Sequence, residues 1–261
     1  MEKELNKYGI LNSLISVLNE GAEDTADVNI AKYLLQNFNR LQELNIYDIA
    51  SECFVSRATI RRFSKKMGFD NFKDLKGQFI NFHDTYLFYR SGIYENSKGQ
   101  PLIKQLVDMA QECESFLTEE RMASIVSDIH NAGQIVFLTS DIYSRQSSEF
   151  QKAMILNGKM VRVITSKYEN NEVLKKMDIQ DLLIVISISG FFVTQIMPFI
   201  EDNGAKKILL TTIQRENYCK IFDEIWYLSK TPQHSNRSVY TVFATQYCLE
   251  KVFDAYLRSL S

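Results

Sequence analysis

Residues 46–67 read IYDIASECFVSRATIRRFSKKM, and this stretch decides the fold of the first part of the chain. Ile46, Ile49 and Ala50 recur at the spacing of one helical face, which predicts a short amphipathic helix. The pattern then breaks, and Ser56 is a favourable N-cap for a second helix, because its hydroxyl can accept a hydrogen bond from a backbone amide two or three residues on. The stretch therefore predicts a helix-turn-helix.

The second predicted helix is strongly basic. Its inward side is expected to hold Ile60, Met67 and either Phe63 or Ser64. Residues 56–76 contain seven lysines and arginines against two aspartates, although the whole chain carries a net charge of −2. Such a helix suits duplex DNA, which carries one negative charge per roughly 1.7 Å of its axis, and small residues at its start would allow close approach to base edges. The residues predicted to contact DNA are Ser56, Arg57, Ala58, Thr59, Arg61, Arg62, Lys65 and Lys66.

A basic helix can also be an ordinary solvated surface. Three features favour DNA binding: the charge is local, the cations follow a capped turn, and an aromatic-rich segment (residues 68–76, GFDNFKDLK) comes next. Phe69 and Phe72 of this segment are expected to anchor a third helix beneath the basic one.

These residues carry a resemblance to a known family. Residues 30–38 and 48–76 resemble the N-terminal domain of the RpiR/MurR family of bacterial transcription regulators. The shared pattern is an Ile-Ala pair, a Val-Ser turn, a Thr followed three residues later by Arg-Phe, and then Lys-x-x-Gly-Phe. It stands here at Ile49-Ala50, Val55-Ser56, Thr59, Arg62-Phe63 and residues 65–69. Phe54 departs from the pattern, since relatives usually have a small residue, often Gly, in the turn.

The composition limits the class of protein. A length of 261 residues allows one large or two ordinary domains, and 45% hydrophobic residues are ample for their cores. The chain has no run of eighteen apolar residues, so no membrane span is expected, and the N-terminal segment lacks the apolar stretch of a signal peptide. The four cysteines and three histidines are scattered. We therefore expect a reduced, cytoplasmic protein without a metal site or cofactor.

The chain is predicted to have two domains. Residues 1–83 form the all-α helix-turn-helix domain, with a first helix at residues 7–18. Residues 84–101 contain turn residues and a proline and are expected to be a linker. In residues 102–261, helical stretches alternate with short apolar runs, which predicts a doubly wound α/β domain with a five-stranded parallel sheet. The expected strands are residues 135–138, 161–164, 182–186, 208–210 and 225–228, followed by a long helix at 238–260.

A ligand site is expected beyond the carboxyl ends of these strands. After the third strand the chain reads ISISGFFVTQ (residues 186–195). Ser187 and Ser189 offer hydroxyls, Gly190 allows close backbone approach, and a helix beginning near Thr194 offers amides, which suits an oxyanion or a phosphate. An ordinary capped turn has the same spacing, and the two interpretations stay open.

Residues 102–261 resemble a sugar isomerase (SIS) domain, the phosphosugar-binding partner of the RpiR helix-turn-helix. The resemblance, with departures in its loops, gives as candidate ligand-binding residues Ser140, Tyr143, Ser187, Ser189, Gly190, Thr194 and His234.

The first loop of the expected site departs from the SIS pattern. Relatives carry Gly-x-Gly-x-Ser after the first strand, whereas residues 139–143 read TSDIY, with Tyr143 in the place of that serine. Asp141 would place a negative charge near an anion unless a cation such as Arg145 or Arg237 screens it. Two phenylalanines, residues 191 and 192, follow Gly190 where relatives have polar residues. The site is therefore expected to be remodelled for another ligand, or lost.

The expected function is a DNA-binding transcription regulator of the RpiR type, controlling a sugar or amino-sugar operon. A SIS-like domain would form a homodimer or homotetramer on double-stranded operator DNA and sense a phosphorylated sugar or an altered small-molecule effector. One alternative is a phosphosugar isomerase-like enzyme, for which Glu149 and His234 are the candidate bases. Another is a pure protein-interaction module. Neither has a use for the basic helix, and no catalytic residue is expected.

Overall fold

The computed structural model describes residues 10–41, 43–77, 83–93, 99–165, 172–233 and 237–260. The chain divides into two units, Met1–Tyr86 and Leu87–Ser261. The division falls inside the range predicted as a linker. The first part of that range is helical, since helix α6 spans His83–Arg90. The predicted domain limits at 83 and 101 stay a prediction.

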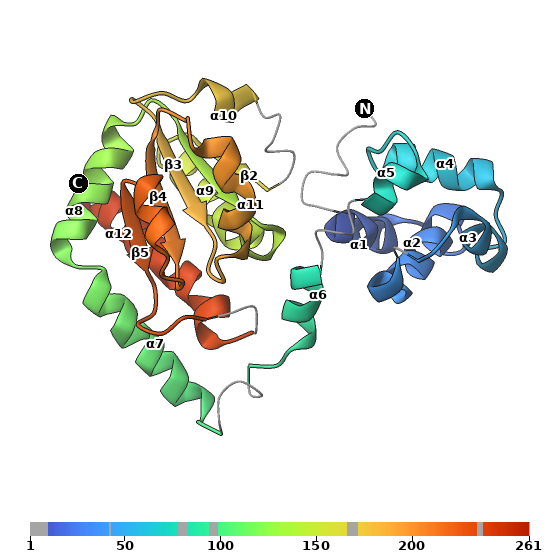
Figure 1. Ribbon diagram of the computed structural model, residues 1–261, viewed down its shortest axis with the longest axis horizontal. Coiled ribbons are helices and arrows are strands. Elements are labelled where there is room, and N and C mark those ends of the chain that lie inside the picture. Colours follow the sequence, from blue (N-terminus) through green and yellow to red (C-terminus); the bar gives the residue numbers. More distant parts are fainter. Residues whose placement is uncertain are drawn as a thin grey trace. The chain divides into compact units, whose positions relative to one another are not determined.

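The first unit is helical in its described residues (Figure 1). Thr25 caps α2, because its hydroxyl accepts a 3.4 Å hydrogen bond from the amide of Val28. Phe69 and Phe72 are both buried in the core of this unit, as expected. Its helices are α1 (Ile10–Glu20), α2 (Ala26–Gln36), a short 3-10 turn (Phe38–Arg40), α3 (Ile46–Glu52), α4 (Arg57–Lys66) and α5 (Phe72–Gly77).

The second unit is a parallel sheet with helices on both faces (Figure 1). The five predicted strands are confirmed as β1 (Ile135–Thr139), β2 (Val161–Ile164), β3 (Leu182–Ile186), β4 (Lys206–Thr211) and β5 (Glu224–Tyr227), and they pair in the order β2-β1-β3-β4-β5. The helices are α7 (Leu102–Phe116), α8 (Glu119–Asn131), α9 (Ser144–Leu156), α10 (Glu172–Lys176), α11 (Phe191–Ile200) and α12 (Thr245–Leu260). The last predicted helix begins with a π-helical segment, Tyr240–Ala244.

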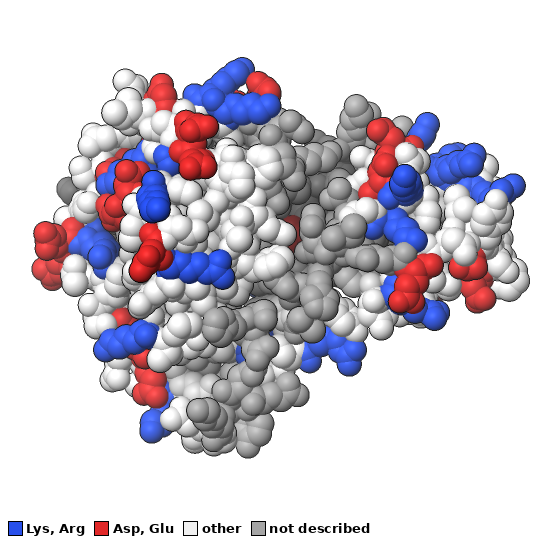
Figure 2. All heavy atoms as spheres, in the orientation of Figure 1, with Lys and Arg blue, Asp and Glu red and all other residues white. Residues whose placement is uncertain are grey.

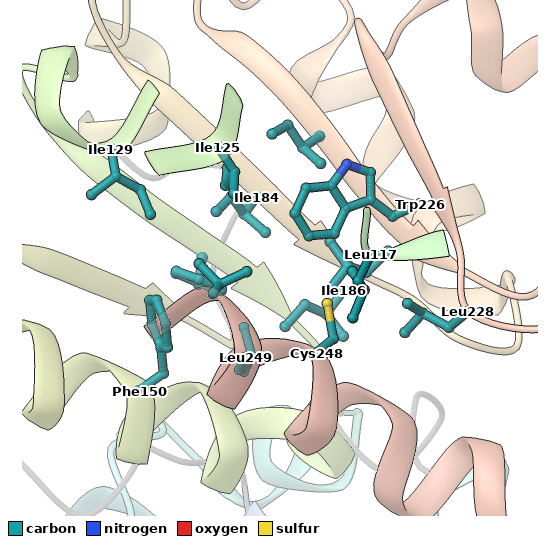
Figure 3. Close-up of a cluster of buried hydrophobic side chains, with 14 of the residues drawn as sticks. Leu117, Ile125, Ile129, Phe150, Ile184, Ile186, Trp226, Leu228, Cys248 and Leu249 are labelled. Carbon is teal, nitrogen blue, oxygen red and sulfur yellow. The ribbon is translucent and has the colours of Figure 1, made fainter. Parts of the chain in front are cut away.

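Both faces of the sheet are apolar, because helices cover both. Side chains of α7, α8, α9 and α12 pack on one face, and those of α10 and α11 pack on the other. Figure 3 shows the first of these cores, where Ile184 and Ile186 of β3 and Trp226 of β5 meet Cys248 of α12. The continuous apolar runs in the sequence follow from this double coverage, since alternate residues of a strand face opposite layers. Among the described residues, no helix is both long and apolar enough to cross a membrane.

Candidate functional site

The helix before the basic helix has a well-formed start. The side-chain oxygen of Asn45 accepts hydrogen bonds from the amides of Tyr47 (2.8 Å) and Asp48 (3.0 Å), and the carboxylate of Asp48 accepts one from the amide of Asn45 at 3.3 Å. This reciprocal arrangement satisfies backbone donors that the first turn of a helix leaves free. It fixes α3 in place ahead of the turn.

The turn between α3 and α4 places Phe54 in a left-handed conformation, with φ of 52°. The amide of Phe54 donates to the carbonyl of Ser51 (3.2 Å), and the amide of Val55 donates to that of Ala50 (3.0 Å). This pair of bonds is the helix-ending motif that favours glycine at the left-handed position. It explains physically why a small residue suits this turn. The phenyl ring of Phe54 is 96% exposed and stabilises nothing in the core.

The predicted cap of α4 is confirmed. The Ser56 hydroxyl oxygen accepts a 3.1 Å hydrogen bond from the amide of Thr59. The helix buries Ile60, as predicted. The sequence left open whether Phe63 or Ser64 lies on the inward side, and both are buried. Burial of Ser64 is possible because its hydroxyl donates to the carbonyl of Ile60 at 3.0 Å.

All five cations of α4 are exposed to solvent. In Figure 2, lysines and arginines gather over α4 in the first unit. Two of the five have partners from other segments. Arg57 donates to the Tyr47 phenol oxygen at 3.0 Å, and Lys66 pairs with Asp27 of α2 at 2.7 Å.

The remaining predicted DNA contacts lie on the same outward side of α4. Arg62 donates a long hydrogen bond of 3.4 Å to the Thr59 hydroxyl. Arg61 and Lys65 form no hydrogen bond or ion pair with the part of the chain that the structure describes. Ala58 and Ser56 are exposed near the helix start. The helix therefore presents a capped, positively charged face with small residues at its leading end, which is what backbone and base-edge contacts in a major groove need.

The loop after β3 is tied into the fold. The Ser187 hydroxyl oxygen accepts a 2.9 Å hydrogen bond from the amide of Val193 and so caps α11, which begins at Phe191, earlier than the expected start near Thr194. Gly190 has φ of +74°, and a Cβ there would lie 3.0 Å from Ile213 and from the Tyr218 hydroxyl. Side chains of the protein itself thus approach Gly190 closely.

The hydroxyls of Thr194 and Ser189 lie in or next to the loop after β3. The Thr194 hydroxyl donates to the carbonyl of Gly190 (2.8 Å) and accepts from the Arg215 guanidinium (3.1 Å). Ser189 is half-buried and forms no hydrogen bond with the described residues. Arg215 was not predicted as a site residue. Its position after β4, the neighbour of β3, is the signal that could have found it, because loops after adjacent parallel strands meet at one edge of the sheet.

The loop after β1 is dominated by Tyr143 and Asp141. Tyr143 is 4% exposed, and burial raises its pKa above the usual value. Burial also raises the pKa of Asp141 to about 7, and no cation counters this effect. Arg145 is exposed and Arg237 lies over the Phe88 ring at 5.6 Å, and neither arginine contributes to the pKa shift of Asp141.

Three further residues were predicted as ligand-binding or catalytic candidates. Ser140 is half-buried beside Asp141. Glu149, a candidate base of the enzyme alternative, is exposed and pairs with Lys152 at 2.9 Å. His234 lies outside the described residues. No cluster of metal-ligating side chains occurs within the ranges that the structure describes.

Comparison with known proteins decides the class of the first unit. Residues 10–82 match the helix-turn-helix domain of the rpiR family. The first unit is an RpiR-family helix-turn-helix domain. The resemblance seen in the sequence is thereby confirmed, and α3, the turn at Phe54 and α4 lie within the residues that match this domain.

The similarity to known regulators extends beyond this RpiR domain. The chain is 23% identical to the HTH-type transcriptional regulator GlvR of Bacillus subtilis (strain 168) over 261 residues, which covers 95% of this chain and 94% of GlvR. It is also similar to the structure of the Vibrio vulnificus NanR protein complexed with ManNAc-6P. That match has a TM-score of 0.51 and 18% identity and covers 95% of this chain and 91% of NanR.

One further solved structure is similar in fold over about two thirds of this chain. A putative phosphosugar isomerase involved in capsule formation from Bacteroides fragilis NCTC 9343 matches with a TM-score of 0.50 and 12% identity, over 65% of this chain and 92% of that chain. At such identity the likeness concerns the fold. The expected architecture, an RpiR helix-turn-helix joined to a SIS-like five-stranded parallel α/β domain, is confirmed.

Proposed function

We propose that this protein is a transcription regulator of the RpiR type that binds operator DNA through α4. The observation that carries the proposal is the exposed basic face of α4, set on a capped helix inside an RpiR-family domain. Buried Ile60 and Phe63 fix the rotation of the helix, so its cations point outward together. Working on DNA, the protein would act in the cytoplasm.

The residues of α4 divide into two roles in this proposal. Arg61 and Lys65 are free to reach phosphates or bases, because no described acidic side chain holds them. Ser56, Ala58 and Thr59 stand at the leading end, where close approach to base edges is needed. The other three cations already have contacts within the protein, and on binding DNA they would exchange these contacts or share them with phosphates. They are Arg57, Arg62 and Lys66.

The proposed assembly is a homodimer, or a homotetramer built from dimers, on a two-fold operator. The second unit offers an apolar surface for it on α7, where the side chains of Leu102, Ile103 and Val107 are 48%, 70% and 46% exposed. Light scattering on the full chain tests this: Ile103→Glu should shift the mass toward the monomer. A monomeric unmodified protein would contradict the proposed assembly.

The proposed target is an operon of sugar or amino-sugar metabolism, with the second unit as the effector domain. The structure of NanR, which has a similar fold, contains ManNAc-6P. In this chain the predicted ligand residues Ser140 and Ser189 follow β1 and β3, and Thr194 lies in α11. Tyr143, in the place of the serine that relatives carry after the first strand, is buried in the core. We therefore propose an effector other than a simple hexose phosphate.

An isomerase activity is not part of the proposal. An isomerase needs a base next to the substrate carbon. Glu149 is an exposed surface residue paired with Lys152, and Ser187 and Gly190 are occupied in capping and packing α11. The similarity to the B. fragilis isomerase concerns the fold, which many functions share.

The experiment that tests the proposal is selection of bound duplexes from a random DNA pool by the full chain. An enriched sequence with two related half-sites, bound less well by Arg61→Ala, supports it. Recovery of the pool without enrichment would contradict it. Lys152→Ala, a lysine of the second unit that pairs with Glu149, serves as the charge-matched control and should select the same sequence.

A further inference from the structure

The sheet order singles out the loops after β1 and β3. β1 and β3 are neighbours in the sheet. The strand that follows β1 in sequence, β2, lies on one side of this pair, and the strand that follows β3, β4, lies on the other side. In open parallel sheets this reversal of strand order opens a crevice at the carboxyl ends of the two strands, where ligands bind. On the β1 side the edge is formed by the connection of residues 140–143 and by the first turn of α9.

This connection holds two buried acceptor oxygens that accept no hydrogen bond. They are Oδ1 of Asp141, two residues beyond the end of β1, and the side-chain oxygen Oε1 of Gln146 in the first turn of α9. Neither side chain has a partner among the described residues. Buried polar atoms are nearly always paired, and each unpaired one costs free energy, more so when charged. A fold that keeps two of them at its switch point is suited to a donor that arrives from outside.

We propose that the connection between β1 and α9 binds the ammonium group of a small ligand, held by Asp141 and Gln146. The inference rests on the proposed role of the second unit as the effector domain. An ammonium group carries three N–H donors and no acceptor, so its chemistry matches unpaired acceptor oxygens such as these two. Its positive charge also compensates a buried carboxylate, which a neutral hydroxyl cannot do.

The same chemistry argues against an anion at this loop. A phosphate is mostly dianionic at neutral pH and offers chiefly acceptors, and the carboxylate of Asp141 would repel it. Among the described residues, no arginine or lysine contributes to the pKa shift of Asp141, which burial raises. One described cation lies on the other side of this sheet edge, because Arg215 donates to the Thr194 hydroxyl in the first half of α11. An anionic group of the same ligand would therefore lie toward α11, and the ammonium group toward α9.

The test uses the ammonium group by itself, because the complete ligand is not identified. The melting temperature of the full chain is measured at pH 8 in methylammonium chloride, in sodium chloride and in tetramethylammonium chloride at equal ionic strength. At this pH, Asp141 with a pKa of about 7 is mostly ionised. Tetramethylammonium has the same charge as methylammonium but no N–H donor, so the comparison separates hydrogen bonding from salt effects.

We expect methylammonium alone to raise the melting temperature, since a ligand that binds only the native state stabilises it. Asp141→Asn should abolish this rise, and Gln146→Leu should reduce it. Glu149→Gln, which removes an exposed carboxylate from the same helix, should leave it unchanged. An equal melting temperature in the three salts, or a rise that persists in Asp141→Asn, overturns the proposal.

The outcome is distinguishable from failure of the proposed regulatory function. DNA binding is measured with the same proteins in sodium chloride, and Asp141→Asn should bind the selected duplex as the unmodified chain does. Loss of DNA binding by the unmodified chain would contradict the regulator while leaving the ammonium result standing. A flat methylammonium response with normal DNA binding would remove only the ammonium site.

Discussion

The guanidinium of Arg57 lies against the ring of Tyr47, with its carbon 4.9 Å from the ring centroid and one nitrogen 3.0 Å from the phenol oxygen. The pair joins the first turn of α3 to the first residue of α4. Arg57 thereby stands in a defined direction before DNA arrives, which lowers the entropy lost when it binds. Tyr47 acts on DNA through Arg57 and is a positioning residue.

Tyr47→Phe should therefore weaken DNA binding modestly. The ring under the guanidinium remains, while the hydrogen bond that orients Arg57 is lost. We expect an increase in Kd of about threefold to tenfold, which corresponds to the roughly 0.5–1.5 kcal/mol of one hydrogen bond. Fluorescence anisotropy on the selected duplex measures it. If Arg57→Ala alone has no effect, or if Tyr47→Phe still weakens binding in an Arg57→Ala background, the coupling between the two residues is refuted.

Phe54→Gly should stabilise the first unit. The left-handed backbone at Phe54 costs a residue with a Cβ roughly 1–2 kcal/mol, and part of the gain is offset because glycine loses more backbone entropy on folding. We expect a net gain of about 1 kcal/mol in the free energy of unfolding, measured by urea denaturation. Phe54→Ala keeps a Cβ and is the matched control, with little expected change. A destabilised glycine variant would show that the exposed ring contributes to the fold.

Ser187→Ala should destabilise the second unit, because the Ser187 hydroxyl caps α11. Loss of such a cap costs typically about 1 kcal/mol. Ser189→Ala is the control, since this hydroxyl forms no hydrogen bond with the described residues, and its effect should stay within about 0.5 kcal/mol. Thermal denaturation of both variants measures the difference. Equal stability of the two would mean that Ser187 is available for a ligand after all.

The stability of the second unit should depend on pH through Asp141. Burial raises its pKa in the folded protein from 3.8 to about 7, so between these values the folded state holds a proton that the unfolded state has lost. Stability from this group therefore falls as pH rises from about 4 to about 7 and stays constant above. At about 1.4 kcal/mol per pKa unit, the ionised carboxyl costs the ligand-free fold roughly 4 kcal/mol at pH 8.

Asp141→Asn cannot ionise and should be more stable than the unmodified chain at pH 8, by an amount that shrinks toward zero near pH 4. Denaturation across this range in an amine-free buffer measures the difference. A variant that is less stable at pH 8 would show that the carboxylate has a compensating partner.

Local sequence patterns predicted the parts of the structure that depend on near neighbours. The helical spacing of Ile60 and Phe63 placed the buried side of α4, and Ser56 marked its first turn, because both effects act within one or two turns of helix. The apolar runs located all five strands, since burial on both faces leaves few polar positions in the central strands β1 and β3. The site residues Arg57 and Lys66 were predicted to point outward, and both are exposed.

The partners of the site residues were not predictable in the same way. Tyr47 contacts Arg57, and Asp27 contacts Lys66, only because different helices pack together. The spacing of residues in the sequence does not predict these pairs. Gly190 was expected to admit a ligand, whereas Ile213 and Tyr218, distant in sequence, occupy its neighbourhood. The sequence left open whether Arg145 or Arg237 would lie beside Asp141. Its isolation results from the positions of Arg145 and Arg237 in the fold.

The central claim is that α4 binds the DNA backbone and bases through its exposed cations. Its most direct test is the salt dependence of binding to the selected duplex, compared between the unmodified chain and Arg61→Ala/Lys65→Ala. Each phosphate contact contributes about −0.9 to the slope of log K against log salt, so loss of two contacts should make the slope shallower by about 2. An unchanged slope and affinity in the double variant would contradict the assignment of α4 as the DNA-binding helix.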